Sequence, residues 1–333
     1  MPRFSVIVPV YNRIDEVRDL LESLLNQSYK DFEVILVEDG STLPCREVAE
    51  TYASKGLDVR YYYKTNEGRS IARNHGIERS NGDYLIFFDS DCVIPADYFQ
   101  TLAGELDTHP LDCFGGPDAA HDSFTPTQKA INFAMTSFLT TGGIRGGKVQ
   151  MEKFVPRSFN MGYSRQVWQK VGGFREMFSE DIDMSTRIRQ AGFSIGLIRP
   201  AYVYHKRRID LKKFWRQVHV FGMSRITLKL LYPDSLKIVH TLPALAVIIG
   251  AIFLLLGTLV SPLWLTPLAV YALVLFFTAL GSTGSIKVAA LSIPAAAIQI
   301  CGYGTGFIRA YFTKILLGRG RDINQEISMR KGK

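Results

Sequence analysis

The sequence predicts an α/β domain with a mostly parallel sheet, followed by helices that enter a membrane. In the first 90 residues, short apolar runs of strand length alternate with segments of helical periodicity. Beyond residue 237, long stretches are apolar and almost free of charge. Strands and helices that alternate in this way form a parallel sheet with helices on both faces.

The predicted strands are continuous apolar runs at Phe4–Val10, Phe32–Glu38, Leu57–Tyr63 and Tyr84–Phe88. Helices are predicted between them at about 14–26, 44–54 and 68–80, with a later helix at 181–190 and a strand at 194–198. The stretch 112–173 is less regular, and its glycine-rich part, 142–147, favours a linker over a substrate loop. Because ligands of such sheets bind at the carboxyl ends of strands, polar clusters there are candidate site residues.

The formal net charge of +8 is unevenly distributed along the chain. Residues 1–205 carry 22 basic and 27 acidic side chains, a net charge of −5. Residues 206–333 carry 17 and 4, a net charge of +13. Between Ile238 and Phe312 there is no acidic residue, and the basic residues are Lys287 and Arg309. We therefore expect the basic part to contact a membrane and expect no nucleic-acid partner.

The C-terminal part divides into three segments. Residues 206–237 mix basic residues with aromatic and aliphatic ones, as in a helix that lies among lipid headgroups. Residues 238–312 hold two or three apolar segments long enough to span a bilayer, and residues 313–333 form a basic tail. Three spans would put the tail on the far side of the membrane, whereas its charge favours the cytoplasmic side. A re-entrant or interfacial segment is the alternative to three spans, so the number of spans stays open.

The four cysteines form no pair at metal-ligand spacing, so neither a zinc site nor a disulfide framework is expected. The N-terminal apolar run lacks the basic region and cleavage site of a signal peptide. We therefore expect residues 1–205 to form a cytoplasmic domain anchored at the inner (plasma) membrane.

Three polar clusters are candidates for chemistry. In Asp89-Ser90-Asp91, alternation along the strand sends both carboxylates to one side, where they suit Mg²⁺ or Mn²⁺ bound to phosphates; a turn is the alternative. Asp39 either accepts from a nucleotide base or ribose, or caps a helix. Arg69 and Arg73 either reach a phosphate or lie on a helix surface.

Two further candidates lie later in the chain. Glu180-Asp181 begins a predicted helix, where acidic residues complement the helix dipole without any further function. A carboxylate that faces a cleft there would also suit a general base for a sugar hydroxyl. His205 is either structural or a third metal ligand.

Taken in order, these motifs resemble those of the family 2 glycosyltransferases, which have the GT-A nucleotide-sugar-binding fold. The matching segments are residues 6–12 (VIVPVYN), 37–41 (VEDGS), 66–76 (NEGRSIARNHG), 82–84 (GDY), 88–91 (FDSD) and 172–174 (GGF), then Glu180-Asp181-x-Asp183 with Arg187, Gly192 and His205. The resemblance covers residues 4–205 and implies a GT-A domain over residues 1–205.

The resemblance also implies a division of roles. Asp181 would be the catalytic base and Glu180 an acceptor contact. Asp89 and Asp91, with His205, would hold a divalent metal, Mn²⁺ or Mg²⁺, on the donor diphosphate. The implied donor-binding residues are Pro9, Tyr11, Asn12, Asp39, Asn66, Gly68, Arg73, Asp83, Asp89 and Ser90.

The implied reaction is an inverting transfer from a nucleotide sugar, most often a UDP-sugar in this family, to a hydroxyl of a lipid-linked glycan acceptor for surface polysaccharide. Processive relatives carry a QxxRW element, whereas this chain reads Trp215-Arg216-Gln217-Val218-His219, which favours addition of one sugar at a time. The alternatives are a polyprenyl-phosphate sugar synthase and a catalytically silent subunit of an export assembly. The Glu180-Asp181 pair favours the hydroxyl acceptor.

Overall fold

The computed structural model describes residues 1–119, 124–142, 154–205 and 210–318. The chain divides into two compact units. The first comprises Met1–His121 and Phe154–Lys206, and the second comprises Asp122–Lys153 and Arg207–Lys333. The glycine-rich stretch at 142–147 lies, apart from Gly142, outside the described residues.

The first unit is built on a seven-stranded sheet in the order β3-β2-β1-β4-β8-β6-β9. Its strands are β1 (Phe4–Val10), β2 (Phe32–Asp39), β3 (Val59–Lys64), β4 (Tyr84–Phe88), β6 (Cys113–Gly115), β8 (Asn160–Ser164) and β9 (Ile195–Leu197). The first four run parallel, whereas β8 pairs antiparallel with both β4 and β6. This confirms the predicted mostly parallel sheet. Strands β6 and β8 come from the stretch whose sequence showed no regular pattern.

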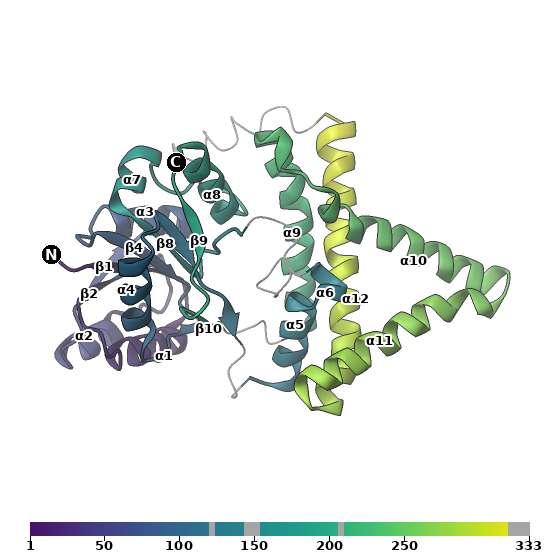
Figure 1. The fold of residues 1–333 in the computed structure, drawn as a ribbon, viewed down its shortest axis with the longest axis horizontal. Coiled ribbons are helices and arrows are strands. Elements are labelled where there is room, and N and C mark those ends of the chain that lie inside the picture. The colour runs from purple at the N-terminus through teal and green to yellow at the C-terminus, as the bar shows by residue number, and fades with distance from the viewer. Residues whose placement is uncertain (120–123, 143–153, 206–209, 319–333) are drawn as a thin grey trace. The chain divides into compact units, whose positions relative to one another are not determined.

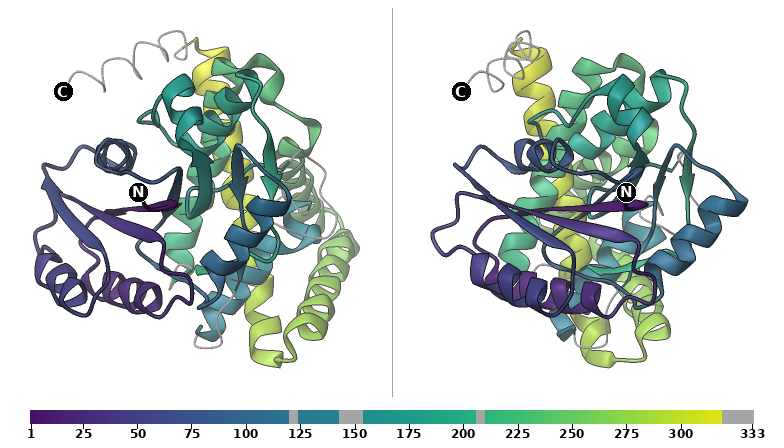
Figure 2. Two further views of the ribbon diagram at one scale, coloured as in Figure 1. Left: turned by 60° about the vertical axis from the view of Figure 1, so that its left-hand side comes forward. Right: turned by 90° about the vertical axis from the view of Figure 1, so that its left-hand side faces the viewer.

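Helices cover both faces of this sheet (Figure 2). They are α1 (Ile14–Leu25), α2 (Arg46–Ser54), α3 (Arg69–Ile77), α4 (Tyr98–Thr108), α7 (Arg165–Val171) and α8 (Glu180–Gln190). Side chains alternate along β1, so that Val6 and Val8 pack with α1, α2 and α4, whereas Ile7 packs on the other face with α3, α7 and α8. The two buried clusters fix the register that brings the strand ends to one edge.

A second, short sheet lies in the same unit. It consists of β5 (Cys92–Val93), β10 (Val203–His205) and β7 (Asp118–Ala119), in the order β5-β10-β7. This sheet brings the last strand of the unit back to the residues that follow β4.

The second unit is helical, and α12 packs against its other long helices (Figure 1). The elements are α5 (Pro126–Thr136), α6 (Phe138–Thr141), α9 (Leu211–Leu231), α10 (Leu242–Leu259), α11 (Thr266–Thr283), α12 (Ile286–Ala310), the short 3₁₀ segments η1 (Pro233–Ser235), η2 (Ile238–His240) and η3 (Pro262–Leu265), and a terminal π-helix η4 (Tyr311–Leu316). Within the described residues, three segments are long and apolar enough to cross a membrane: Leu242–Leu259, Pro262–Thr283 and Ile286–Leu316.

Candidate active site

Asp39 ends β2 and holds the loop that leads into α3. Its Oδ1 accepts hydrogen bonds from Lys64 Nζ at 2.8 Å and from the N–H of Glu67 at 3.0 Å, and its Oδ2 accepts one from the N–H of Gly68 at 2.8 Å. Asn66 donates from Nδ2 to the backbone carbonyl of Asp39. A buried carboxylate at the end of β2 therefore holds the backbone of Glu67 and Gly68, directly before α3, and makes no capping hydrogen bond within that helix.

Gly68 directly precedes α3, and both its backbone conformation and its close neighbour require a glycine there. Its φ of +103° lies in the region that favours glycine, and a Cβ there would lie 2.6 Å from Oε1 of Glu176. Burial raises the pKa of Glu176 above its usual value, and the negative charge of Glu180 adds to the shift. A carboxylate therefore covers the turn in which Gly68 lies.

Asn12 joins the carboxyl ends of β1 and β2. Its N–H donates to Ser41 Oγ at 2.7 Å, and its Oδ1 accepts from the N–H of Thr42 at 2.9 Å. Its backbone is left-handed, with φ of 53°. Pro9 is half-buried in β1 and Tyr11 is 51% exposed, so the three predicted donor residues of this motif lie at the sheet edge.

The Asp89-Ser90-Asp91 motif directly follows β4, which ends at Phe88, so its three residues lie outside the strand. The expectation that strand alternation sends both carboxylates to one side is therefore wrong in its premise. Asp89 accepts a hydrogen bond from Arg73 Nη2 at 2.7 Å, whereas Asp91 Oδ1 lies 3.1 Å from Nε2 of His205. Ser90, between them, is buried. The two carboxylates thus contact different partners.

Arg73 is a fully buried cation that connects two motifs. Its Nη1 donates to Glu180 Oε1 at 2.9 Å, and its guanidinium lies 5.5 Å from the ring centroid of Phe174. Arg69, one turn earlier in α3, donates to Glu180 Oε2 at 2.8 Å. Both oxygens of Glu180 are thus bound by arginines and the residue is 1% exposed, which favours a positioning role over the predicted acceptor contact.

Asp181 is the second residue of α8, where the helix dipole favours a carboxylate. Its Oδ1 accepts from the N–H of Ile182 at 2.8 Å, and its Oδ2 lies 3.5 Å from Nη1 of Arg157. Ser179, just before the helix, has a left-handed backbone with φ of 63°. Sequence reasoning missed Arg157 because it lies in the stretch with no regular pattern.

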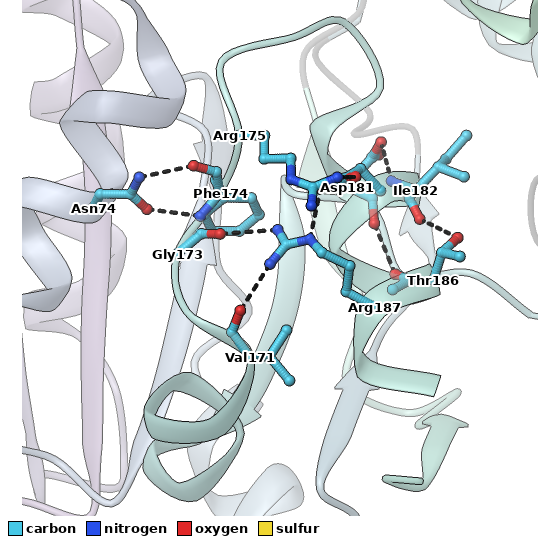
Figure 3. Close-up of polar contacts among 11 residues, drawn as sticks. Asn74, Val171, Gly173, Phe174, Arg175, Asp181, Ile182, Thr186 and Arg187 are labelled. Carbon is cyan, nitrogen blue, oxygen red and sulfur yellow. Dashed lines mark hydrogen bonds and ion pairs between the residues drawn. The ribbon is translucent and has the colours of Figure 1, made fainter. Parts of the chain in front are cut away.

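The segment 171–174, which precedes α8, is held by hydrogen bonds from α8 on one side and from α3 on the other (Figure 3). Arg187 donates from Nη1 to the carbonyl of Val171 at 3.0 Å and from Nη2 to that of Gly173 at 2.8 Å. Asn74 of α3 and Phe174 exchange two hydrogen bonds of 2.8 Å each. These contacts hold the segment that precedes Glu180-Asp181 against the helix that carries Arg69 and Arg73.

His205 reaches Asp91 through the short sheet. In the antiparallel pairing of β10 with β5, it lies opposite Cys92. Its ring stacks on Phe159 with centroids 4.5 Å apart, and its Nδ1 lies 4.0 Å from Oδ2 of Asp118. No local pattern in the sequence indicates this pairing, which joins residues more than a hundred positions apart.

The residues at this point fit a divalent metal. Ligands that share an edge of an octahedral shell with bonds of about 2.1 Å lie about 3 Å apart. The distance of 3.1 Å between Asp91 Oδ1 and His205 Nε2 is compatible with that edge, and equally with a direct hydrogen bond between the two side chains. Cys92 lies within the same group, but burial keeps the pKa of its thiol well above the usual range, and the thiol donates to the Phe159 carbonyl at 3.6 Å. A protonated thiol is a poor ligand, so the fit rests on Asp91 and His205.

Asp83 lies elsewhere. It is exposed and directly precedes β4, at the amino end of the strand whose carboxyl end leads to Asp89. The structure therefore does not bring Asp83 to the edge where the other predicted donor residues gather.

A mostly parallel sheet with acidic side chains at its carboxyl edge is the arrangement of an α/β domain that binds its ligand at the strand ends. The chain belongs to glycosyl transferase family 2, whose family model matches residues 5–174.

Curated relatives and solved structures agree with this assignment. The chain is 30% identical over 186 residues to the uncharacterized glycosyltransferase EpsJ of Bacillus subtilis (strain 168), covering 55% of this chain and 53% of EpsJ. It is 40% identical over 172 residues to the uncharacterized glycosyltransferase YibD of Escherichia coli (strain K12), covering 51% and 46%. The match thus spans about half the length of these relatives.

Among solved structures, the mannosyltransferase PcManGT from Pyrobaculum calidifontis, in complex with GDP-Man and Mn²⁺, superimposes with a TM-score of 0.58. The match covers 96% of this chain and 88% of that one at 17% identity, which shows a shared fold.

Proposed function

We propose that this protein transfers one sugar at a time from a nucleotide-sugar donor to a hydroxyl of a lipid-linked glycan acceptor, with inversion at the anomeric carbon. The observation that carries the proposal is the buried Arg73. It bonds to Asp89 on the candidate donor side and to Glu180, the neighbour of the candidate base Asp181. Arg73 would thereby hold the proposed donor and acceptor sites at a fixed separation, as group transfer requires.

On the donor side, Asp91 and His205 would hold Mn²⁺ or Mg²⁺, and Asp89, 33% exposed at its side chain, would face the diphosphate. When bound, the ion would offset the charge that develops on the leaving diphosphate. The mannosyltransferase that shares this fold was solved with GDP-Man and Mn²⁺, which supports a nucleotide sugar and a divalent ion, and a UDP-sugar is the first donor to test.

On the acceptor side, Asp181 takes the proton of the attacking hydroxyl. The acceptor oxygen forms a bond to the anomeric carbon while the bond from that carbon to the diphosphate breaks, and the proton stays on Asp181. Arg157 lies 3.5 Å from the Asp181 carboxylate and orients it.

Transfer to polyprenyl phosphate is the second candidate, because a phosphate acceptor needs no base. A catalytically silent subunit of an export assembly is the third. The Asp181 carboxylate is 14% exposed at its side chain and thus accessible to an acceptor hydroxyl, which supports the first candidate over both.

The test is a turnover screen of the purified protein with UDP-, GDP- and dTDP-sugars, Mn²⁺ or Mg²⁺, and either a glycan lipid or undecaprenyl phosphate. We expect Asp181→Asn to lower kcat by about 10²- to 10⁴-fold with little change in donor KM. Asp97→Asn, which alters an exposed carboxylate at the start of α4, is the control. Unchanged kcat in Asp181→Asn would exclude Asp181 as the base. Transfer to undecaprenyl phosphate alone would favour the synthase, and no turnover with any donor would favour the silent subunit.

A further inference from the structure

Helices α9 and α12 approach so closely that their backbones touch at glycines. A Cβ on Gly222 would lie 2.0 Å from a carbonyl oxygen of α12, and a Cβ on Gly306 would lie 2.0 Å from the carbonyl oxygen of His219. Further along, Lys314 donates from Nζ to Thr227 Oγ1 at 2.9 Å. Contacts further along α9 are made with residues further along α12, so α9 runs parallel to the C-terminal half of α12. Both helices must therefore lie in the same environment, either water or lipid.

The face of α9 that points away from α12 is basic. Phe214 and Val218 are buried in the cluster that includes α12, whereas Lys212 and Arg216, two positions earlier on the helix in each case, are exposed. Two residues correspond to about 200° around a helix, so the basic pair lies opposite the buried pair. If α12 crossed the hydrocarbon core, α9 would carry these charges into it, which is strongly unfavourable.

Helices α10, α11 and α12 enclose a triangle (Figure 1). A Cβ on Gly304 of α12 would lie 2.6 Å from the carbonyl oxygen of Pro243, so α10 begins near that point. At the other end, α11 finishes at Thr283, directly before α12 begins at Ile286. At 1.5 Å per residue, α10, α11 and the stretch of α12 between these points each measure about 27 Å. Three equal sides meet at about 60°.

This geometry separates two orientations in a bilayer. With α12 along the membrane normal, α10 and α11 would tilt by about 60° and rise only about 14 Å each. With α12 in the membrane plane, they tilt by about 30° and reach a depth of about 23 Å, within the usual range of helix tilt. The second orientation also keeps the basic face of α9 out of the core. The hydrocarbon core is about 30 Å thick, so the apex would stop short of the far surface.

The apex between α10 and α11 is apolar. Leu259, Val260 and Leu263 are 74%, 68% and 79% exposed. Between Lys237 and Lys287 the sequence contains no acidic residue, lysine or arginine. An apex that emerged into water on the far side would expose these side chains, whereas an apex inside the bilayer buries them in lipid.

The backbone of this apex is also suited to lipid. The N–H of Ser261 donates to the carbonyl of Leu256 at 3.0 Å, and the N–H of Trp264 donates to the carbonyl of Ser261 at 3.1 Å. The N–H of Leu263 donates to Ser261 Oγ, and Pro262 has no N–H. Irregular backbone is excluded from lipid because its polar groups lack partners, and these donors have partners.

We propose that α10 and α11 form a re-entrant hairpin that enters the bilayer and returns to the same face. Helices α9 and α12 lie along that face, with the basic side of α9 available to anionic headgroups. The chain after α12 therefore stays on the side of the first unit. The proposal concerns anchoring and does not depend on the transfer reaction.

The test is labelling of single introduced cysteines with a membrane-impermeant maleimide, in sealed vesicles of either orientation, on a Cys301→Ser background. Cys45, Cys92 and Cys113 are buried in the first unit. Glu50→Cys, on the exposed surface of α2, marks the side of the first unit. We expect Ser285→Cys and a cysteine added after Lys333 to be labelled from that same side. Leu263→Cys is expected to be labelled from neither side until detergent is added.

Each other outcome overturns the proposal. Labelling of Leu263→Cys from the far side would show a hairpin that crosses the membrane. Labelling of the terminal cysteine from the far side would show that α12 crosses. Labelling of Leu263→Cys from the near side would show an apex outside the bilayer. Reaction of Leu263→Cys in detergent, together with the wild-type elution profile on gel filtration, shows that the variant is folded and its thiol reactive.

Discussion

Beyond their apolar cores, the two units join key elements by different kinds of contact. In the first unit, a buried charge connects separate elements. Arg73 of α3 bonds to Asp89, which follows β4, and to Glu180, which begins α8. In the second, α9 and α12 meet backbone to backbone at Gly222 and Gly306. Directional bonds suit a site that must place reacting groups, whereas contact by shape needs no polar partner and suits helices beside lipid.

The largest effect on stability is expected when the buried arginine of the first unit is removed. Arg73→Met leaves Glu180 buried with one arginine fewer, and we expect the free energy of unfolding to fall by about 3–5 kcal/mol. Denaturant unfolding of the detergent-purified protein measures it. Arg18→Met removes an exposed arginine of α1 and is expected to change stability by less than about 0.5 kcal/mol. Equal effects of the two variants would show that the buried network does not stabilise the first unit.

A smaller loss of stability is expected when the close contact between α9 and α12 is disturbed. In Gly306→Ala the new methyl group meets a backbone oxygen that cannot rotate away, so α9 and α12 must separate, at a cost of about 1–3 kcal/mol. The midpoint of thermal unfolding in detergent measures the loss. Gly250→Ala in α10, where a Cβ meets nothing within 4 Å, is the control and is expected to be neutral or slightly stabilising. A neutral Gly306→Ala would mean that the helices are not in backbone contact.

The smallest expected effect is a pH dependence of stability in the first unit, caused by Glu176. Glu176 has a raised pKa, so the folded state binds its proton more tightly than the unfolded state does. Its stabilising contribution is therefore complete below the usual glutamate pKa of about 4.3 and is lost as the pH rises through the raised value.

Glu176→Gln removes this dependence. We expect its melting temperature relative to the wild type to increase as the pH is raised from about 4 to about 8. Glu50→Gln, at an exposed position, is expected to show no such trend. A constant difference between Glu176→Gln and the wild type across this range would contradict the raised pKa.

Much of the first unit could be predicted from the sequence because its signals are local. The runs at Phe4–Val10 and Phe32–Asp39 are apolar over strand length, and the polar residues after them fall at the carboxyl edge. The apolar helices α10, α11 and α12 were predicted for the same reason, since length and composition suffice.

What the sequence did not yield depends on contacts between distant segments. The approach of His205 to Asp91 follows from the register of two very short strands, which no periodicity marks. Asp89 can contact Arg73 because β4 ends at Phe88, just before it. Arg73 can be buried because carboxylates on other elements, such as Glu180, neutralise its charge. A charged residue on a helix reads as exposed until its partners are known.

Among the described residues, the non-glycine positions with a left-handed backbone are Asn12 and Ser179. Asn12 follows β1 and Ser179 precedes α8. A left-handed backbone costs about 1–3 kcal/mol for a residue such as serine and less for asparagine, and the surrounding hydrogen bonds sustain it. A substrate that lets either turn relax would recover part of that free energy on binding. Affinity at this edge would then depend on the release of backbone strain as well as on the contacts that a ligand makes.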